Sequence, residues 1–505
     1  MILINAQNDR SDTLGLFSRY VPLPIPRNIA VLAAYLIEKG HEVRVWDDAI
    51  KQLGPEDIRE LVKDMKKPYI FGVSCLTASI TRGYSIAGMI KSIYPDAVVI
   101  FGGVHPTVLP EEALDTGLVD FVVKKEGEVP LEALLRALKN GEDPSGINNL
   151  SFKRNGKLTH NPAVPGPDFD SLPTFPYYLF EKHRERYDFG FVVNSRGCPH
   201  DCIFCSPRSI TGRRVTFGSP ERAVNEIELL VNKYNIRLIT FSDESLLMNK
   251  EHVRMVCELI RGRGLHKRVS FQCQARGDEV DEPILKVLKG ANFISIYVGL
   301  ETASERLMTL INKKETVKQN IEAMKLIKKH GFGLSGAVIL GLPTETKEER
   351  LQSYRLAKKY LDYVRFNNAT PYPGTKLYEI AKEEGRLNTG KDWQNLNACG
   401  TLVEGIFRSR RLAYVPAGTS ELELKRDIMK YNLLFSFRAK VIRKLLQQRS
   451  GTSGWFKMRP GWYRNPVEWF YLIRLGLRVV RSWIELGVIT VVFRFKGETM
   501  GKGME

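Results

Sequence analysis

Two series of short apolar runs alternate with amphipathic stretches along the chain. In the first series, strand-length apolar runs are separated by helical patterns, for example at residues 28–39 and 80–93. The runs lie at residues 1–5, 43–47, 69–74, 97–101 and 119–123. Continuous apolar strands that alternate with amphipathic helices are typical of a parallel sheet covered on both faces. Residues 1–140 are therefore predicted to form a doubly wound, Rossmann-like α/β domain.

The second series follows a polar segment that is rich in proline and glycine. Residues 141–188 contain runs such as GEDPSG and NPAVPGPDFDSLPTFP, which suit a linker. Further strand patterns then alternate with helical ones, at residues 191–195, 238–242, 269–274, 293–299, 334–340 and 363–370. Such units close part of a β/α barrel, in which ligands bind at the carboxyl ends of the strands. Residues 189–395 are therefore predicted to form a partial (β/α)6 barrel, and residues 396–505 a helical, basic and aromatic C-terminal region.

The composition indicates the cellular setting. Seven cysteines among 505 residues are too few for a disulfide scaffold, and three of them fall within eight residues, which is typical of metal binding in a reducing compartment. The first residues show no basic leader followed by a long apolar run. No segment reaches the roughly 18 uncharged apolar residues of a membrane span. We therefore expect a cytoplasmic protein, with contact to a membrane surface left open.

The clustered cysteines come directly after the first predicted barrel strand, in the segment SRGCPHDCIFCS. The spacing Cys-x3-Cys-x2-Cys lets Cys198, Cys202 and Cys205 bind three irons of a 4Fe-4S cluster and leaves the fourth iron without a protein ligand. An open iron can chelate the amino and carboxylate groups of S-adenosylmethionine, whose sulfonium bond then breaks when an electron arrives. The alternative is a structural zinc site with His200 as the fourth ligand, but a fourth thiolate at paired spacing is missing.

The segment SRGCPHDCIFC resembles the signature of radical S-adenosylmethionine enzymes, in which the aromatic residue before the last cysteine approaches the adenine. Later segments also resemble that family at the expected strand ends: FSDES (241–245), QARGD (274–278), VGLETAS (298–304), ILGLPTET (339–346) and PYPGT (371–375). The resemblance implies the following S-adenosylmethionine contacts: Phe204, Asp243, Glu244, Gln274, Arg276, Glu301 and Gly341. No catalytic residue is assigned beyond the cluster cysteines.

These assignments also have a chemical basis. Asp243 and Glu244 suit the ammonium group of the cofactor, and Glu301 suits its ribose hydroxyls. Arg276 suits its carboxylate, with two parallel hydrogen bonds if the geometry allows. Gly341 belongs to a turn that lets the backbone approach the adenine closely. The alternative for each is that a polar residue at a strand end caps a helix or solvates a loop.

Three segments of the first domain lie where open parallel sheets bind ligands, after the third, fourth and fifth strands: GVSCLTAS (72–79), FGGVHPT (101–107) and KKEGEVP (124–130). Together with the cluster motif, they resemble cobalamin-binding radical S-adenosylmethionine enzymes over residues 1 to 395. The aspartate of the Asp-x-His-x-x-Gly motif is missing before His105, so the resemblance implies cobalamin without a histidine beneath the cobalt. A relic domain that has lost its cobalamin is the alternative. The implied cobalamin contacts are Ser74, Thr77, Gly102, Gly103, His105, Thr107, Glu126 and Gly127.

The resemblance implies a methyltransferase that acts on an unactivated carbon, in which a 5'-deoxyadenosyl radical activates the substrate and methylcobalamin supplies the methyl group. Cyclisation or rearrangement in a pigment, lipid or terpenoid pathway is the alternative, because it uses the same cofactors. RNA methylthiolation would need further cluster cysteines in the first domain, where only Cys75 occurs. A cobalamin sensor without catalysis would not need the three-thiolate loop. The expected partners are a small-molecule or lipid substrate and an electron donor such as flavodoxin or ferredoxin, with nucleic acid not favoured.

The C-terminal region holds most of the excess positive charge. Residues 401–505 contain 20 Lys and Arg against 8 Asp and Glu, which accounts for 12 of the net 18 positive charges. In residues 465–485, four charged residues share one narrow face of a predicted helix, and the apolar residues lie mostly elsewhere: Arg474, Arg478, Arg481 and Glu485. Such a helix lies in a membrane interface that contains anionic lipid, or packs its apolar side on the barrel and solvates its arginines.

Overall fold

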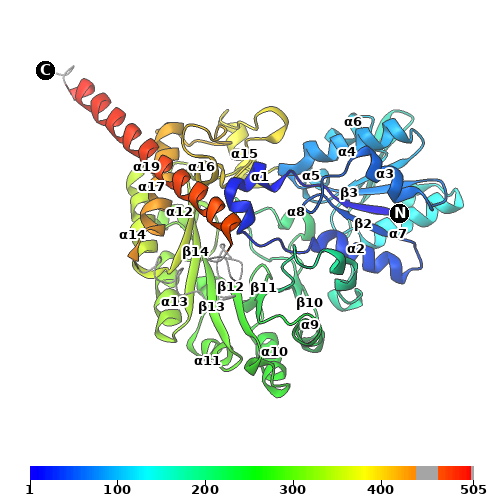
Figure 1. The fold of residues 1–505 in the computed structure, drawn as a ribbon, viewed down its shortest axis with the longest axis horizontal. Coiled ribbons are helices and arrows are strands. Elements are labelled where there is room, and N and C mark those ends of the chain that lie inside the picture. Colours follow the sequence, from blue (N-terminus) through cyan, green and yellow to red (C-terminus); the bar gives the residue numbers. More distant parts are fainter. Residues whose placement is uncertain (440–464, 502–505) are drawn as a thin grey trace.

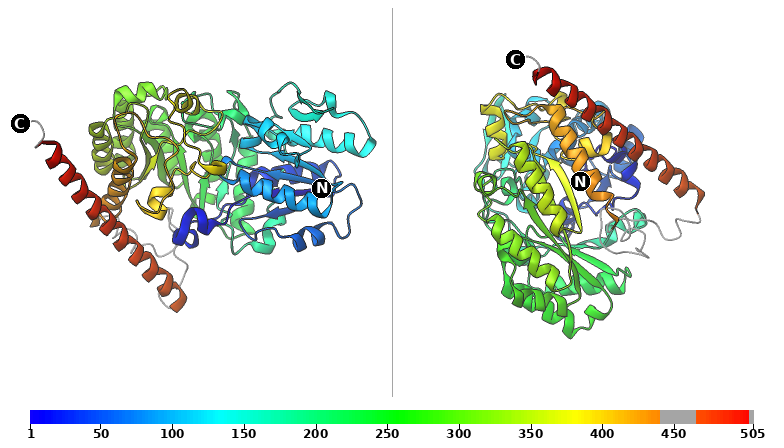
Figure 2. Two further views of the ribbon diagram at one scale, coloured as in Figure 1. Left: turned by 90° about the horizontal axis from the view of Figure 1, so that it is seen from above. Right: turned by 90° about the vertical axis from the view of Figure 1, so that its left-hand side faces the viewer.

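The computed structural model describes residues 1–439 and 465–501. It contains two parallel sheets with helices on their faces, and the sheets lie side by side, the first coloured blue to cyan and the second mostly green in Figure 1. A long helix, α19 (Pro466–Gly501), runs along the outside of the second unit (Figure 2). The predicted α/β fold class is confirmed in both units.

The first sheet has seven strands in the order β2-β1-β3-β4-β5-β6-β7. Its parallel strands follow the first series of apolar runs: β1 (Ile2–Asn5), β2 (Arg44–Asp47), β3 (Ile70–Ser74), β4 (Val98–Gly102) and β5 (Phe121–Val123). The helices between and after them are α2 (Arg27–Glu38), α3 (Pro55–Val62), α4 (Ile80–Ile93), α5 (Val104–Val108), α6 (Pro110–Asp115) and α7 (Glu128–Asn140). Separate apolar cores fill the two faces of this sheet. The doubly wound arrangement explains why its strands are apolar throughout.

Part of the segment predicted to be a linker belongs to this sheet. β6 (Leu150–Arg154) and β7 (Lys157–His160) extend it as an antiparallel hairpin beside β5. Leu150 and Phe152 are buried in the core, so the hairpin covers an edge that β5 would otherwise expose. The prediction followed the abundance of proline and glycine and missed these two apolar residues, which are enough to hold a short hairpin.

The second sheet has six parallel strands in the order β15-β14-β13-β12-β11-β8. The strands are β8 (Phe191–Val192), β11 (Leu238–Phe241), β12 (Ser270–Ala275), β13 (Phe293–Glu301), β14 (Gly333–Leu340) and β15 (Tyr363–Asn368). The helices between them are α9 (Pro220–Asn232), α10 (Lys250–Gly262), α11 (Glu282–Gly290), α12 (Glu305–Leu310), α13 (Val317–Lys329) and α14 (Lys347–Tyr360). β8 and β15 lie at opposite edges, as expected of a partial barrel. A short antiparallel pair, β9 (Ser195–Arg196) and β10 (Thr216–Phe217), flanks the cysteine loop.

The C-terminal region packs on the barrel through α17 (Glu421–Ser436), which contacts β15 and α14. The fully buried guanidinium of Arg350 binds Glu423 and Asp427 of α17 at 2.9 Å each. Before α17 lie α15 (Lys376–Glu383), at the end of the barrel segment, and α16 (Gly400–Glu404). In the described part of the chain, the helices are too short or too polar to cross a membrane.

A candidate active site between the two sheets

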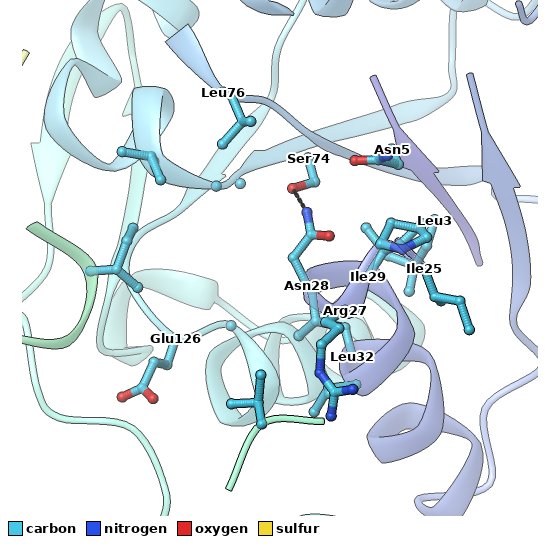
Figure 3. Close-up of a pocket in the computed structure, with 18 of the residues that line it drawn as sticks. Leu3, Asn5, Ile25, Arg27, Asn28, Ile29, Leu32, Ser74, Leu76 and Glu126 are labelled. Carbon is cyan, nitrogen blue, oxygen red and sulfur yellow. Dashed lines mark hydrogen bonds between the residues drawn. The ribbon is translucent and has the colours of Figure 1, made fainter. Parts of the chain in front are cut away.

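A cavity of about 750 Å³ opens where the carboxyl ends of the two sets of strands meet. From the first sheet it is lined by Ser74, Leu76 and Gly102 to Val104, and from the barrel by Ser195 to Gly197 and Glu244. The close-up in Figure 3 shows Ser74 and Leu76 on one side of this space, with Glu126 and Arg27 of α2 below them. Residues of both predicted domains therefore line one cavity. On the barrel side these are the residues directly before the cysteine loop and Glu244 of FSDES, whereas the three cysteines and the other four barrel segments are not among its lining residues.

Five of the predicted cobalamin contacts line this cavity: Ser74, Gly102, Gly103, Glu126 and Gly127. Asn28 donates a hydrogen bond to the Ser74 hydroxyl at 2.6 Å (Figure 3). Gly103 has a φ of 96°, and a Cβ at this position would lie 2.5 Å from the carbonyl oxygen of Cys75. Only glycine fits there, so β4 can end close to the loop after β3 and leave space beyond it.

The other three predicted contacts point elsewhere. His105 is fully buried, with its imidazole 3.3 Å from the Thr77 hydroxyl and 3.4 Å from a Glu112 carboxylate oxygen. The Thr107 hydroxyl accepts a hydrogen bond from the backbone N–H of Lys125 at 2.9 Å. Since α5 begins directly after Gly103, its first turn carries these side chains away from the cavity. Thr77, His105 and Thr107 hold the loops around the site instead of lining it.

The cavity suits a large flat ring such as a corrin. Glycines occupy the positions where backbone faces the open space, and the neighbouring lining is largely apolar, including Leu3, Ile25, Ile29 and Leu32 (Figure 3). None of the described residues that line it is a histidine. The lining therefore fits a bulky ring that is held mainly by apolar contacts.

The cysteine loop is fixed to the barrel through its backbone. The N–H of Ile203 donates to the carbonyl of Ile311 at 3.0 Å, and its own carbonyl accepts from the N–H of Leu377 at 2.8 Å. Burial raises the pKa of the Cys202 thiol to about 11. It also raises the pKa of the Cys205 thiol, to about 12. Three protonated thiols in one short loop bind a cation only with release of protons.

The residues of this loop fit an iron-sulfur cluster better than a zinc ion. Among the residues that the structure describes, no three His, Cys, Asp or Glu side chains converge on a point where one metal ion would sit. A structural zinc site needs four ligands around a single ion, whereas a cube of irons takes its thiolates at separate corners.

The two neighbouring acidic residues after β11 have different surroundings. Asp243 is buried, and its carboxylate accepts hydrogen bonds from the Ser195 hydroxyl at 2.5 Å and the Asn194 N–H at 3.0 Å. Gln274 donates to the backbone carbonyl of Asp243. Asp243 therefore holds the segment that leads into Cys198 through one carboxylate oxygen, while its other oxygen has no hydrogen-bond partner among the described residues, and its contact with a ligand stays a prediction. Glu244 is exposed and lines the cavity.

A buried network of charges lies beside the cysteines. Arg276 binds Asp278 through Nε at 3.0 Å and Nη2 at 2.9 Å, and its Nη2 also lies 3.5 Å from Glu315. Lys313 lies 3.1 Å from Glu315 and 3.4 Å from Glu301. The guanidinium predicted to bind a carboxylate ligand is therefore already paired within the protein. Sequence analysis missed Lys313 and Glu315, because charged residues in a loop carry no signal that they will be buried.

Phe204 and Gly341 lie on the barrel side, away from the cavity lining. Phe204 packs against an apolar cluster that includes Leu307 and Leu377. Gly341 has a φ of 83°, and a Cβ there would lie 2.6 Å from the Leu424 side chain. The predicted turn is thus present, while the contact of both residues with adenine stays a prediction.

Two arginines that sequence analysis did not select connect the two units. Arg196, two residues before Cys198, lies 3.3 Å from Glu126 and 2.7 Å from Glu128 of the first unit. Arg27 of α2 donates to the Phe191 carbonyl at 3.0 Å and stacks on the Phe175 ring at 4.1 Å. These partners are far apart in the sequence, so no local pattern could have identified them.

Comparison with known proteins agrees with this geometry. The family model of the radical SAM superfamily matches residues 192–357, and that of the B12 binding domain matches residues 17–135. An uncharacterized methyltransferase of Pyrococcus horikoshii is 32% identical over 84% of this chain and 91% of its own length. An anaerobic magnesium-protoporphyrin IX monomethyl ester cyclase of Rubrivivax gelatinosus is 27% identical over 70% of this chain and 66% of its own length.

The fold is also similar to a solved structure. The radical S-adenosylmethionine methyltransferase TsrM from Kitasatospora setae, with cobalamin and a 4Fe-4S cluster bound, aligns with a TM-score of 0.68. The alignment covers 86% of this chain and 88% of that one at 17% identity. The two family models divide the chain in the order that the two sheets show. This chain belongs to the family of cobalamin-binding radical S-adenosylmethionine enzymes.

Proposed function

We propose that the enzyme methylates an unactivated carbon atom of a small molecule or lipid. The single observation that carries this proposal is the shared cavity, which the cobalamin side and the cluster side both line. Methyl transfer needs the methyl donor and the activated carbon to meet in one enclosed space. The methyltransferase of Pyrococcus horikoshii, which matches most of this chain, supports the same reaction class.

The residues divide into two sets in this proposal. Cys198, Cys202 and Cys205 would hold the 4Fe-4S cluster, and Ser74, Gly102, Gly103, Glu126 and Gly127 would face the cobalamin. When bound, the cluster supplies the electron that cleaves S-adenosylmethionine, and the cobalamin supplies the methyl group. The glycines of the first sheet leave the space for the ring, and the apolar lining excludes water from it.

Binding of S-adenosylmethionine depends mainly on charge. Glu244 is exposed to the cavity and close enough to Cys198 and Cys205 to affect both thiols, so it is placed to accept hydrogen bonds from the ammonium group. The carboxylate group of S-adenosylmethionine would lie on the side of Arg276 and Lys313, two cations next to Cys202. Glu301, which lies 3.4 Å from Lys313, stays the candidate for the ribose hydroxyls.

Cyclisation is the second candidate, because the Rubrivivax gelatinosus cyclase also matches this chain. The two reactions differ in whether they need a methyl donor. A cyclase uses no methyl donor, whereas each methylation consumes a second S-adenosylmethionine to restore the donor. The products derived from S-adenosylmethionine therefore distinguish the two reactions without knowledge of the substrate.

The deciding experiment is anaerobic turnover of the reconstituted enzyme with an extract of its own cells. Methyl transfer predicts matched amounts of 5'-deoxyadenosine and S-adenosylhomocysteine. 5'-Deoxyadenosine without S-adenosylhomocysteine would replace methyl transfer with cyclisation or rearrangement. The same assay tests the electron donor, since flavodoxin or ferredoxin is expected to support turnover in place of a chemical reductant.

A further inference from the structure

Helix α19 packs on the protein with its charged side. Glu468, which is 1% exposed, forms a two-point ion pair with Arg19, through Nε at 3.1 Å and Nη2 at 2.5 Å. The Glu485 carboxylate accepts from the backbone N–H of Ile406 at 2.7 Å and lies 3.1 Å from Arg481. Arg481 in turn donates to the carbonyl of Glu404 at 2.7 Å. This orientation is the reverse of the one in which the apolar side packs on the barrel.

These contacts fix the rotation of the helix about its own axis. Leu486 and Ile489 are buried beside Met429 and Leu433 of α17. Turning α19 to bury a different side would break this apolar contact and leave the Glu468 and Glu485 carboxylates without partners. Removing one partner of a buried ion pair is strongly destabilising. The outward face of α19 is therefore a stable feature of the fold.

That outward face is apolar along most of the helix. Exposed side chains follow one another three or four residues apart, so they form one continuous stripe: Phe470, Ile473, Leu477, Val480, Ile484 and Val488. Leu477 and Ile484 are 65% and 60% exposed. Trp469 and Trp483 are exposed beside this stripe. The ring of Phe437, directly after α17, packs edge-on against the Trp483 ring, with the ring centroids 6.0 Å apart. A contiguous apolar stripe that is exposed in this way marks an interaction surface.

The charge and shape of the region identify the partner. Residues 401–505 carry an excess of 12 positive charges, and Arg474 is exposed next to Phe470, with its guanidinium 5.5 Å from that ring. In Figure 2, α19 is an outer ridge whose C-terminal end extends beyond the other elements, so it presents a convex edge. A convex apolar ridge with tryptophans at its sides and an exposed arginine beside it, in a region of net positive charge, suits a fluid interface with anionic headgroups.

We propose that α19 is a membrane-docking helix, which lies parallel to the surface of an anionic bilayer with the Phe470 to Val488 stripe among the acyl chains. The helix rests on the surface and does not cross it. The inward charges keep the helix attached to the enzyme while its apolar face is in the lipid. The enzyme would thus work at the membrane surface, where apolar substrates are concentrated.

The test is sedimentation of the full-length protein with vesicles of phosphatidylcholine alone or mixed with phosphatidylglycerol. We expect binding to the anionic vesicles that is weakened on the order of tenfold in the double variant Leu477→Glu, Ile484→Glu. The matched control is Leu229→Glu, Met255→Glu, which adds the same charge at exposed apolar residues of α9 and α10. This control is expected to bind like the unmodified protein.

Two results would overturn the proposal. One is that the unmodified protein stays in the supernatant when anionic vesicles are sedimented at low salt, whatever the variants do. The other is that light scattering shows a dimer which the Leu477→Glu, Ile484→Glu variant converts to a monomer without any change in vesicle binding. The stripe would then be the interface with a second copy of this chain. Both variants change exposed side chains, and far-UV circular dichroism checks that their helix content is unchanged.

Discussion

The two sheets present very different edges to the same cavity. The first sheet ends in Ser74 and in glycines, and one carboxylate of its lining, Glu126, lies 3.3 Å from an arginine of the other unit. The barrel ends in three thiols beside a buried network that includes Arg276 and Lys313. A large ring is accommodated by removing side chains, whereas a small charged ligand is held by fixing charges. The contrast teaches that two neighbouring sheet edges of the same α/β type can be suited to ligands of opposite character.

Loss of one cluster ligand would test whether the two edges act separately. Cys202→Ala is expected to abolish the cluster, seen as loss of bound iron and of the visible absorbance, and with it all 5'-deoxyadenosine formation. Cobalamin binding is expected to stay within about twofold of the unmodified protein, because the first sheet has its own cores. The control Cys399→Ala changes a cysteine outside the loop and should keep iron content and activity.

Most of this architecture could be predicted from the sequence. Every apolar run of the two series became a strand, because a strand buried on both faces must be apolar over its whole length. The run at residues 191–195 is the least regular, since it divides into β8 and β9 on either side of a break. The cysteine loop was equally clear, because its three ligands lie within eight residues.

The parts that could not be predicted depend on distant partners. Asp243 and Arg276 have the residue types expected of ligand contacts, yet one Asp243 oxygen is held by Ser195 and the Arg276 guanidinium is paired with Glu315 as well as with Asp278. His105 turns inward because a helix starts directly after Gly103. The orientation of α19 is set by Arg19, which is 449 residues away from Glu468 in the chain. A periodic pattern gives the two faces of a helix but not which one the protein covers.

The ion pair between Arg196 and Glu128, which connects the two units, provides the next test. Arg196→Ala removes the cation from Glu128, whose side chain is 4% exposed and has one oxygen without a hydrogen-bond partner. We expect a loss of about 3 kcal/mol in the free energy of unfolding, because a buried carboxylate is left unpaired. Urea denaturation measures this loss, and iron content should not change.

The matched control for this junction is Arg154→Ala. Arg154 pairs with Asp143 at 3.4 Å, and both side chains are more than half exposed. Its removal is expected to cost less than about 0.5 kcal/mol. Equal losses in the two variants would mean that Arg196 is an ordinary surface residue and that the two edges are not connected through it.

The glycine edge is tested by adding a single carbon atom. Gly103→Ala forces alanine to a φ of 96° and places its Cβ 2.5 Å from the Cys75 carbonyl oxygen, at an expected cost of about 2 kcal/mol. Cobalamin binding, followed by its visible spectrum, should weaken while the iron content is retained. Gly88→Ala is the control, since Gly88 lies inside α4 and its new Cβ would be 3.9 Å from Leu118. Unchanged cobalamin binding in Gly103→Ala would contradict the role given to this edge.

The smallest expected effect is a change of stability with pH, caused by a buried carboxyl group of the barrel. Glu345 is buried in the turn after β14, and this burial raises its pKa from 4.5 to about 8. A raised folded-state pKa favours folding fully below pH 4.5, and this contribution is lost as the pH rises through 8. Compared with Glu345→Gln, the unmodified protein should therefore lose about 1 kcal/mol of stability from pH 6 to pH 7.

Glu349, in the first turn of α14, provides the opposite case. Hydrogen bonds from Arg306, Ser304 and Thr346 outweigh its burial and lower its pKa from 4.5 to about 2. Its contribution is present above pH 4.5 and is lost only as the pH falls through 2, so Glu349→Gln should lower stability by a constant amount from pH 6 to pH 7. Denaturation at several pH values separates the two slopes. The stability difference between each Gln variant and the unmodified protein is compared across pH. If this difference stayed constant for Glu345→Gln as well as for Glu349→Gln, Glu345 would be ionised in the folded protein. The barrel edge would then carry one more negative charge than we infer.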